Sequence, residues 1–133
     1  MPKLRVVRTT KAAAGAVAVQ LAIGRHVLLA DTSLENGGDD LGPDPHELLD
    51  AALASCTALT FTLYARRKGM KPASIEVEID HDESDGVYRM RREVRLAGEL
   101  SAEERTRLLE IANRCPVHRT LSGRFEITSR LVD

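Results

Sequence analysis

Aromatic residues and net charge are both scarce in this sequence, and the two shortages together exclude one class of partner. The 133-residue chain has no Trp, two Phe and two Tyr, and its formal net charge is −1 at pH 7. Proteins that hold single-stranded nucleic acid stack its bases on aromatic side chains and offset its phosphates with positive charge. The composition therefore predicts a protein that does not bind nucleic acid.

Targeting and membrane-spanning segments are also lacking. No apolar segment with a cleavage site follows Met1. The uncharged run of residues 51–64 is shorter than the roughly 20 residues that a membrane span needs. We therefore expect a cytoplasmic protein without a membrane partner, and the chain length predicts a single domain over residues 1–133.

Motifs for cofactors and metals are missing as well. The sequence has no phosphate-binding glycine loop, no Gly-x-Ser-x-Gly elbow and no dinucleotide fingerprint, so no cofactor is expected. Cys115 and His118 have a spacing that suits a metal, with Cys56 as a third ligand. Zinc sites usually add a second Cys or His pair at short spacing, and the sequence offers none, so we expect no metal.

The first third of the chain predicts strands. Partial period-2 alternation and β-branched residues predict strands over residues 4–8, 16–23 and 26–30. Residues 31–45 are rich in Gly, Pro and Asp, which favour turns, and this segment is expected to be a long loop.

A long helix is predicted next. Asp44 suits its N-cap and Pro45 its first turn, while Gly69 suits its end after Lys68. The middle of this helix is apolar on every side. Such a helix is expected to be buried all round, in a core or against a partner.

Residues 75–96 predict a hairpin whose register can be derived from its turn. Asp85 and Gly86 suit a two-residue turn, which places Ile75 opposite Leu96 on one face. The other face then carries three acid–base pairs and one like-charged pair: Glu76 with Arg95, Asp80 with Arg91, Asp82 with Arg89, and Glu78 with Glu93. These charges are expected to form a solvated sheet face and not a binding patch.

The last third predicts a second helix and a final strand. Ser101 opens a capping box, and the helix ends near Cys115, before Pro116. Residues 117–122 suit one more helical turn, and residues 124–131 alternate as a strand. Three strands, a helix, two strands, a helix and a strand form an α+β pattern.

The two cysteines allow two interpretations. Cys56 lies within the apolar helix and Cys115 lies 59 residues later. Free cysteines are often buried as small hydrophobic side chains. A chain of this length buries a core without disulfides, however, and a cytoplasmic disulfide is more often catalytic than structural. The spacing leaves open whether the two sulfurs meet.

Five blocks of sequence together resemble the OsmC/Ohr family, most closely its OsmC-like branch that includes YhfA-type proteins. They cover most of the chain from Gly24 onward: residues 24–31, 37–49, 52–57, 64–69 and 115–121. The resemblance implies an OsmC-like fold and an intertwined homodimer, in which sheets from both chains wrap two central helices. It also implies a thiol peroxidase that reduces organic hydroperoxides in defence against oxidative stress.

The resemblance assigns a role to each cysteine. Cys56 would attack the O–O bond and become a sulfenic acid, and Cys115 would resolve that acid as a disulfide. A dithiol, carried by lipoyl groups in characterised relatives, would reduce the disulfide by exchange.

Two further roles fall on positions that depart from the family pattern. The studied enzymes place a Glu ten residues before the peroxidatic Cys, where this chain has His46, with Glu47 next to it. They also hold the thiolate with an Arg. Because residues 31–64 contain none, Arg25 is the nearest candidate and Arg8 a more remote one. Nine helical residues correspond to roughly 13.5 Å. Glu47 would therefore act on the Cys56 of the other subunit, or else only favour the helix dipole.

A second function class stays open. The same fold could form a non-catalytic dimer that binds a small apolar ligand or acts as a thiol redox sensor. The acidity of Cys56 separates the two classes, because a reactive thiolate needs a nearby cation or hydrogen-bond donors.

Overall fold

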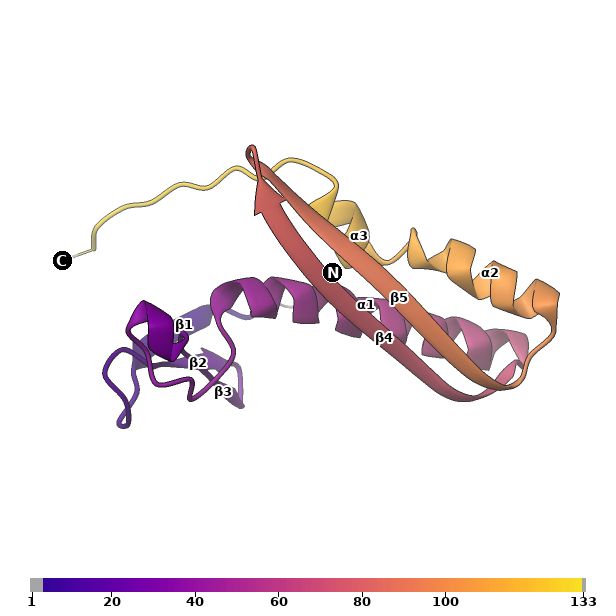
Figure 1. The fold of residues 1–133 in the computed structure, drawn as a ribbon, viewed down its shortest axis with the longest axis horizontal. Coiled ribbons are helices and arrows are strands. Elements are labelled where there is room, and N and C mark those ends of the chain that lie inside the picture. The colour runs from indigo at the N-terminus through magenta and orange to yellow at the C-terminus, as the bar shows by residue number, and fades with distance from the viewer. Residues whose placement is uncertain (1–3, 133) are drawn as a thin grey trace. The chain divides into compact units, whose positions relative to one another are not determined.

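Two units make up the chain, one ending at Leu49 and the other beginning at Asp50. The computed structural model describes residues 4–132. Helix α1 (Pro45–Lys68) includes the boundary between the units, and each unit is described here by itself (Figure 1).

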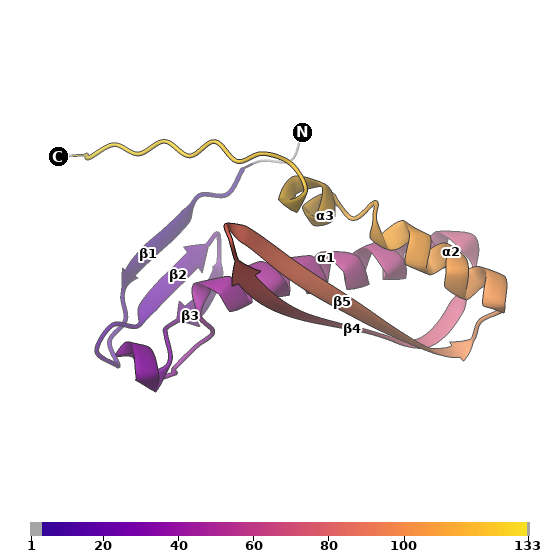
Figure 2. The same cartoon turned by 45° about the horizontal axis from the view of Figure 1, so that its top comes forward.

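The first unit is built on a three-stranded antiparallel meander. Its strands are β1 (Val7–Lys11), β2 (Val19–Ile23) and β3 (His26–Ala30), in that spatial order (Figure 2). The third strand has the predicted bounds, whereas the first two differ from the predicted 4–8 and 16–23. The reason is the connection: residues 12–18 turn back with Gly15 at a φ of +82°, so pairing begins only at Lys11 and Val19.

One buried carboxylate organises the loop that follows. The loop holds the short 3₁₀ helix η1 (Leu34–Asn36). Asp31 accepts backbone hydrogen bonds from Thr32, Asp39 and Leu41 at 2.8, 3.2 and 3.1 Å. The N–H groups of Leu41 and Thr32 hold the pKa of the Asp31 carboxyl below its usual range. The predicted Gly-rich loop therefore has a defined shape without being a strand or an α-helix.

Both ends of α1 lie where the sequence predicted them. Asp44 Oδ1 accepts the N–H of Glu47, and Glu47 Oε1 accepts the N–H of Asp44, each at 2.8 Å. These reciprocal bonds satisfy two donors that the helix itself cannot. At the other end Gly69 has a φ of +70°, and the N–H of Met70 reaches the carbonyl of Ala65 at 2.9 Å.

The second unit contains a long hairpin with the predicted register. Strands β4 (Lys71–Ser84) and β5 (Val87–Glu99) pair so that Ile75 lies opposite Leu96. Asp85 and Gly86 have φ values of +54° and +74°, as a type I′ turn requires. The acid–base pairs and the like-charged pair also lie opposite each other as predicted.

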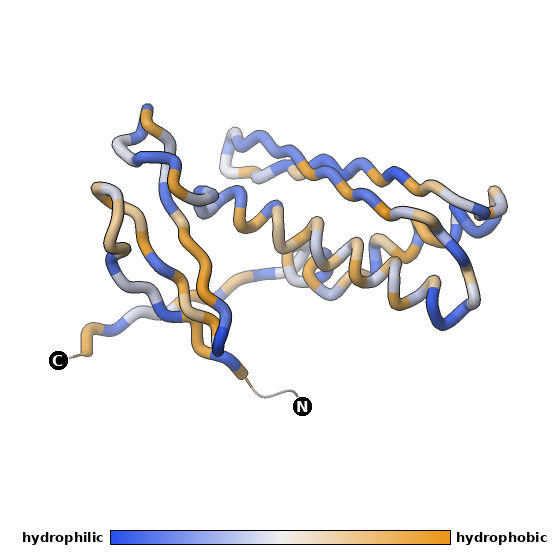
Figure 3. Tube along the Cα trace, turned by 90° about the horizontal axis from the view of Figure 1, so that it is seen from below, coloured by the Kyte–Doolittle hydropathy of each residue, from blue (hydrophilic) through white to orange (hydrophobic). Residues whose placement is uncertain are grey.

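Ion pairs across and along the strands neutralise the charges on the outer face of the hairpin. Arg91 reaches both Asp80 and Asp82 at 2.6 Å. Arg95 reaches Glu78 at 2.5 Å and Glu93 at 3.8 Å, so one guanidinium serves the like-charged pair. Hydrophilic residues accordingly dominate the hairpin in Figure 3. These groups are exposed, and the interpretation of a solvated face is confirmed.

The inner face of the hairpin packs on helices α1 and α2. Helix α2 (Ala102–Ala112) begins with the predicted capping box at Ser101, and α3 (Pro116–Leu121) follows it after a short break. The buried cluster joins residues of α1 and α2: Phe61, Tyr64, Leu108, Ile111 and Ala112. Hairpin residues such as Val94 and Leu96 cover this cluster, so the second unit has its own core.

The predicted final strand is wrong for the single chain. Within the described residues, 124–132 form no strand, and the chain runs extended after α3 (Figure 1). Phe125, Ile127 and Leu131 are 57, 85 and 93% exposed. Alternation makes a segment suitable for a sheet, but hydrogen bonding requires a strand edge to pair with. No strand of this chain pairs with it among residues 4–132.

The core of the second unit gives a stability prediction with a neighbouring control. Leu108 is fully buried against Phe61, whereas Leu109 is 59% exposed on the same helix. Leu108→Ala should lower the free energy of unfolding by about 2–5 kcal/mol, because it removes buried methyl groups and leaves a cavity. Leu109→Ala should change it by less than about 1 kcal/mol. Urea denaturation followed by circular dichroism measures both, and equal losses would contradict this description of the core.

Candidate active site

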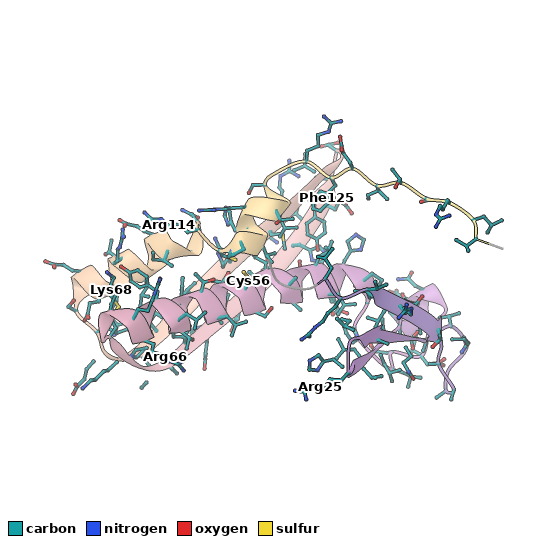
Figure 4. The ribbon with its side chains drawn as sticks, turned by 180° about the vertical axis from the view of Figure 1, so that it is seen from behind. Arg25, Cys56, Arg66, Lys68, Arg114 and Phe125 are labelled. Atoms are coloured by element: carbon teal, nitrogen blue, oxygen red, sulfur yellow. The ribbon has the colours of Figure 1, made fainter. Side chains whose placement is uncertain are left out.

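The fold brings the two cysteines together. Cys56 lies midway along α1 and is half-buried, beside α3 in Figure 4. Cys115 is fully buried and is the residue immediately before α3. Both are free thiols, and they lie close enough for each to shift the pKa of the other. The question that the spacing of 59 residues left open is thus answered for the reduced chain.

Pro116 determines how the backbone meets the sulfurs. It cannot continue α2, and it begins α3 at the position where a missing N–H costs nothing. The next N–H groups belong to the first turn of α3, where a helix provides no backbone partner. The N–H of Val117 lies 3.5 Å from Cys56 Sγ, and the N–H groups of His118 and Val117 both lower the pKa of Cys115.

The two thiols differ in acidity. Burial raises the pKa of the Cys56 thiol, and its hydrogen bond with Cys115 raises it further. Burial also raises the pKa of Cys115, but bonds from Cys56 and from the His118 and Val117 N–H groups outweigh burial and lower it overall. In the reduced pair, the negative charge is therefore most stable on Cys115, with Cys56 as the donor.

Arg92 is the charged residue of this site that the sequence analysis missed. Its Nη1 donates to Thr57 Oγ1 and its Nη2 donates to His118 Nδ1, each at 3.0 Å. Burial lowers the pKa of Arg92, and negative charge on Cys115 and Cys56 acts in the opposite direction. A signal was present in the sequence, because Arg92 interrupts an alternating inward-facing set: Tyr88, Met90, Arg92, Val94 and Leu96.

His118 is neutral in this arrangement. A guanidinium only donates, so the Nδ1 of His118 must accept and carries no proton. Burial lowers the pKa of His118, and the nearby charge of Arg92 lowers it further. The ring therefore contributes an acceptor to the site and no charge near pH 7.

Two hollows flank the cysteine pair. A cavity of about 210 Å³ is lined by Leu53, Met90, Arg92 and His118. A groove of about 520 Å³ is lined by Thr60, Leu63, Ile111 and Pro116, with Arg66, Arg67 and Arg114 also on its walls. Thr60 lies one helical turn after Cys56 and lowers the pKa of that thiol, so the groove lies near that sulfur. An organic molecule could thus approach Cys56, whereas Cys115 is covered.

A second polar cluster connects α1 with the hairpin. Asp50 Oδ2 contacts His81 Nδ1 at 2.5 Å, and Asp50 Oδ1 accepts the hydroxyl of Tyr88 at 2.8 Å. The rings of His81 and Tyr88 stack with centroids 4.6 Å apart. Tyr88 also lines the 210 Å³ cavity. The cluster therefore fixes one wall of that cavity.

Arg25 and Glu47, the two remaining predicted site residues, belong to the first unit. Arg25 lies at the turn between β2 and β3 (Figure 4), and its role stays a prediction. Glu47 lies in the first turn of α1 and bonds to Asp44, which is the local role given above as the alternative. Its action on another subunit also stays a prediction. Among residues 4–132, no group of three or more His, Cys, Asp or Glu side chains could hold a metal ion.

Comparison with known proteins identifies the family. The sequence profile described as OsmC-like protein matches residues 37–130, and the chain therefore belongs to the OsmC family. An uncharacterized protein of Haloferax volcanii is 29% identical over 92 residues, which cover 66% of this chain and 70% of the relative. The profile does not separate the branches of the family, so the YhfA-type assignment stays a prediction.

Solved structures show the same α+β fold. The OsmC-like protein of Mycoplasma pneumoniae has a TM-score of 0.76 at 20% identity, covering 92% of this chain and 90% of that one. The organic hydroperoxide resistance protein OhrB of Bacillus subtilis has a TM-score of 0.60 at 19% identity, covering 91 and 92% of the two chains. The predicted OsmC-like fold is therefore confirmed.

The unequal acidity of the thiols can be measured directly. Absorbance at 240 nm during a pH titration of the reduced protein should show two thiolate steps, one below and one above the ordinary cysteine pKa of roughly 8.5. The lower step arises from the donors around Cys115, and the upper from the burial of Cys56. In urea the steps should merge near the ordinary value. Two coincident steps in the folded protein would contradict the coupling of the pair.

Proposed function

We propose that this chain reduces organic hydroperoxides through the Cys56–Cys115 pair, as a thiol peroxidase of oxidative-stress defence. The observation that carries the proposal is the contact between a half-buried thiol and a buried thiol of lowered pKa. Family membership and the likeness in fold to a protein named for organic hydroperoxide resistance support it.

The arrangement supplies each atom that the reaction needs. The Cys115 thiolate takes the proton of Cys56, and the Cys56 sulfur attacks the outer peroxide oxygen. The O–O bond breaks, Cys56 is oxidised to a sulfenic acid, and the peroxide is reduced to an alkoxide. The alkoxide takes the proton back from the Cys115 thiol and leaves as an alcohol. The Cys115 thiolate then attacks the Cys56 sulfur and releases hydroxide, which solvent protonates to water.

Access and recycling follow from the exposure of the two sulfurs. The peroxide reaches Cys56 from the 520 Å³ groove, where Leu63 and Ile111 offer apolar contact to its organic group. A dithiol reductant, such as a lipoyl group, then attacks the disulfide at the half-buried Cys56 and leaves Cys115 as the departing thiolate. The lowered pKa of Cys115 favours that direction of exchange.

A homodimer belongs to the same proposal. Helix α1 buries one stripe, including Leu53 and Phe61, while Leu59 and Leu63 are 63 and 55% exposed. By length and composition α1 is apolar enough to cross a membrane. Only 28% of its most apolar 18 residues are buried in the single chain. A second copy covers this face without a membrane and offers a strand edge to residues 124–131. The proposed setting is the cytoplasm, where cellular reductants keep thiols reduced between turnovers.

One observation favours a second candidate, a thiol redox sensor. The half-buried Cys56 lies next to a second cysteine that can resolve its sulfenic acid, which is also the arrangement of a redox sensor. Turnover separates the two functions, because a sensor reacts once for each reduction whereas a peroxidase cycles with its reductant.

The disulfide is the first product to test. One equivalent of cumene hydroperoxide should form one Cys56–Cys115 disulfide within each chain, and Cys115→Ser should leave a sulfenic acid on Cys56 that dimedone traps. Peptide mapping by mass spectrometry measures both. An NADPH-coupled assay with lipoamide should then show repeated turnover. Over-oxidised Cys56 without a disulfide would remove Cys115 as the resolving thiol.

The cross-subunit role of Glu47 is testable in mixed dimers. Glu47→Gln preserves the cap with Asp44, since Gln also caps, but should slow peroxide reduction roughly 100-fold if the carboxylate orients Arg25 near the other Cys56. A dimer that combines a Glu47→Gln subunit with a Cys56→Ser subunit should regain one intact site. Sedimentation first establishes the dimer, and the two parent homodimers are the controls. Mixed dimers as inactive as the parents would refute the cross-subunit role.

A further inference from the structure

Arg92 occupies an unusual position for a positive charge. It lies on the inward face of β5 between Met90 and Val94 and is half-buried. Its neighbours Arg91 and Arg95 face outward and pair with carboxylates. Among the residues that the structure describes, no carboxylate lies within ion-pair distance of Arg92. A guanidinium removed from water without an opposite charge is costly, so its position calls for an explanation.

Arg92 donates hydrogen bonds to two residues, and each of these is close in sequence to one of the cysteines. One arm of the guanidinium donates to Thr57, which directly follows Cys56 on α1. The other arm donates to His118, three residues after Cys115 on α3. Both acceptors are neutral, so neither cancels the charge. The nearest negative charge that the site itself generates is the thiolate of the cysteine pair, whose interaction with Arg92 is attractive.

We infer that Arg92 is the positioning residue that stabilises the thiolate of the Cys56–Cys115 pair. Its charge favours the deprotonated pair, and its two hydrogen bonds hold α3 beside α1. Arg92 thereby supplies, from within the same unit, the cation that the family resemblance sought at Arg25. The catalytic consequence rests on the proposed function, whereas the effect on thiol acidity does not.

The chain offers a matched set of variants. Arg92→Gln removes the charge but keeps a polar side chain. Arg92→Lys keeps the charge but lacks the guanidinium, whose two Nη atoms bond to Thr57 and His118. Arg91→Gln removes the same charge from the outer face of the same strand, next to the site in sequence and away from it in space. Circular dichroism checks that each variant folds.

Thiol acidity is the primary measurement. In the 240 nm titration, Arg92→Gln should raise the pKa of the lower thiolate step, because it removes a positive charge that attracts the thiolate. A rise of one unit would lower the thiolate fraction at pH 7 about tenfold. Arg92→Lys should restore much of the shift, and Arg91→Gln should match the wild type. A purely structural Arg92 would not produce this split between Lys and Gln.

Other outcomes overturn the inference. A folded Arg92→Gln protein with an unchanged lower step refutes it, and so does a shift produced by Arg25→Gln instead. If Arg92→Gln does not fold, Arg92→Lys decides: a titration near that of the wild type supports the role of charge, and a shift of one unit or more refutes it. Peroxide turnover is measured separately. An inactive wild type with an Arg92-dependent titration would refute only the proposed function.

Discussion

The positive charge on the inner face of the hairpin is the constraint around which the second unit is arranged. The outer arginines of β5 already hold the neighbouring carboxylates, so Arg92 is left with neutral acceptors on two different helices. Satisfying both acceptors at once fixes α3 beside α1. Thr57 directly follows Cys56, and His118 lies three residues after Cys115, so one side chain of the hairpin links the two segments that carry the sulfurs.

Acidity and access are divided between the two thiols. The backbone donors at the start of α3 favour negative charge on Cys115, which is fully buried. Cys56 is half-buried, and Thr60, one helical turn after it, lines the groove. A buried thiolate is protected from over-oxidation, because peroxides must first meet the other sulfur.

The sequence predicted what short-range physics determines. The Asp85–Gly86 turn set the hairpin register, and the caps at Asp44 and Gly69 set the bounds of α1. The final strand failed because alternation describes a strand but not the edge that it needs. The meeting of the cysteines was a resemblance-based expectation, since no local rule relates positions so far apart.

Arg92 lay within reach of sequence reasoning and was missed for a different reason. The predicted register already placed it between apolar residues of one face, opposite Ile79. Charge pairing across the outer face accounted for Arg91 and Arg95, and the arginine on the other face was not examined. An arginine at an inward position carries more information than one at an outward position, because only the former must be compensated by a site.

The face that a single chain leaves uncovered connects assembly with access to the thiol. Leu63 is exposed on α1, and it also lines the groove that opens beside Cys56 through Thr60. In the proposed dimer, a second copy covers the exposed face of α1 and so becomes part of the wall of that groove. The apolar surface that drives association is then also the surface that determines which hydroperoxides fit. On this reasoning, oligomerisation is required for a complete substrate site as well as for stability.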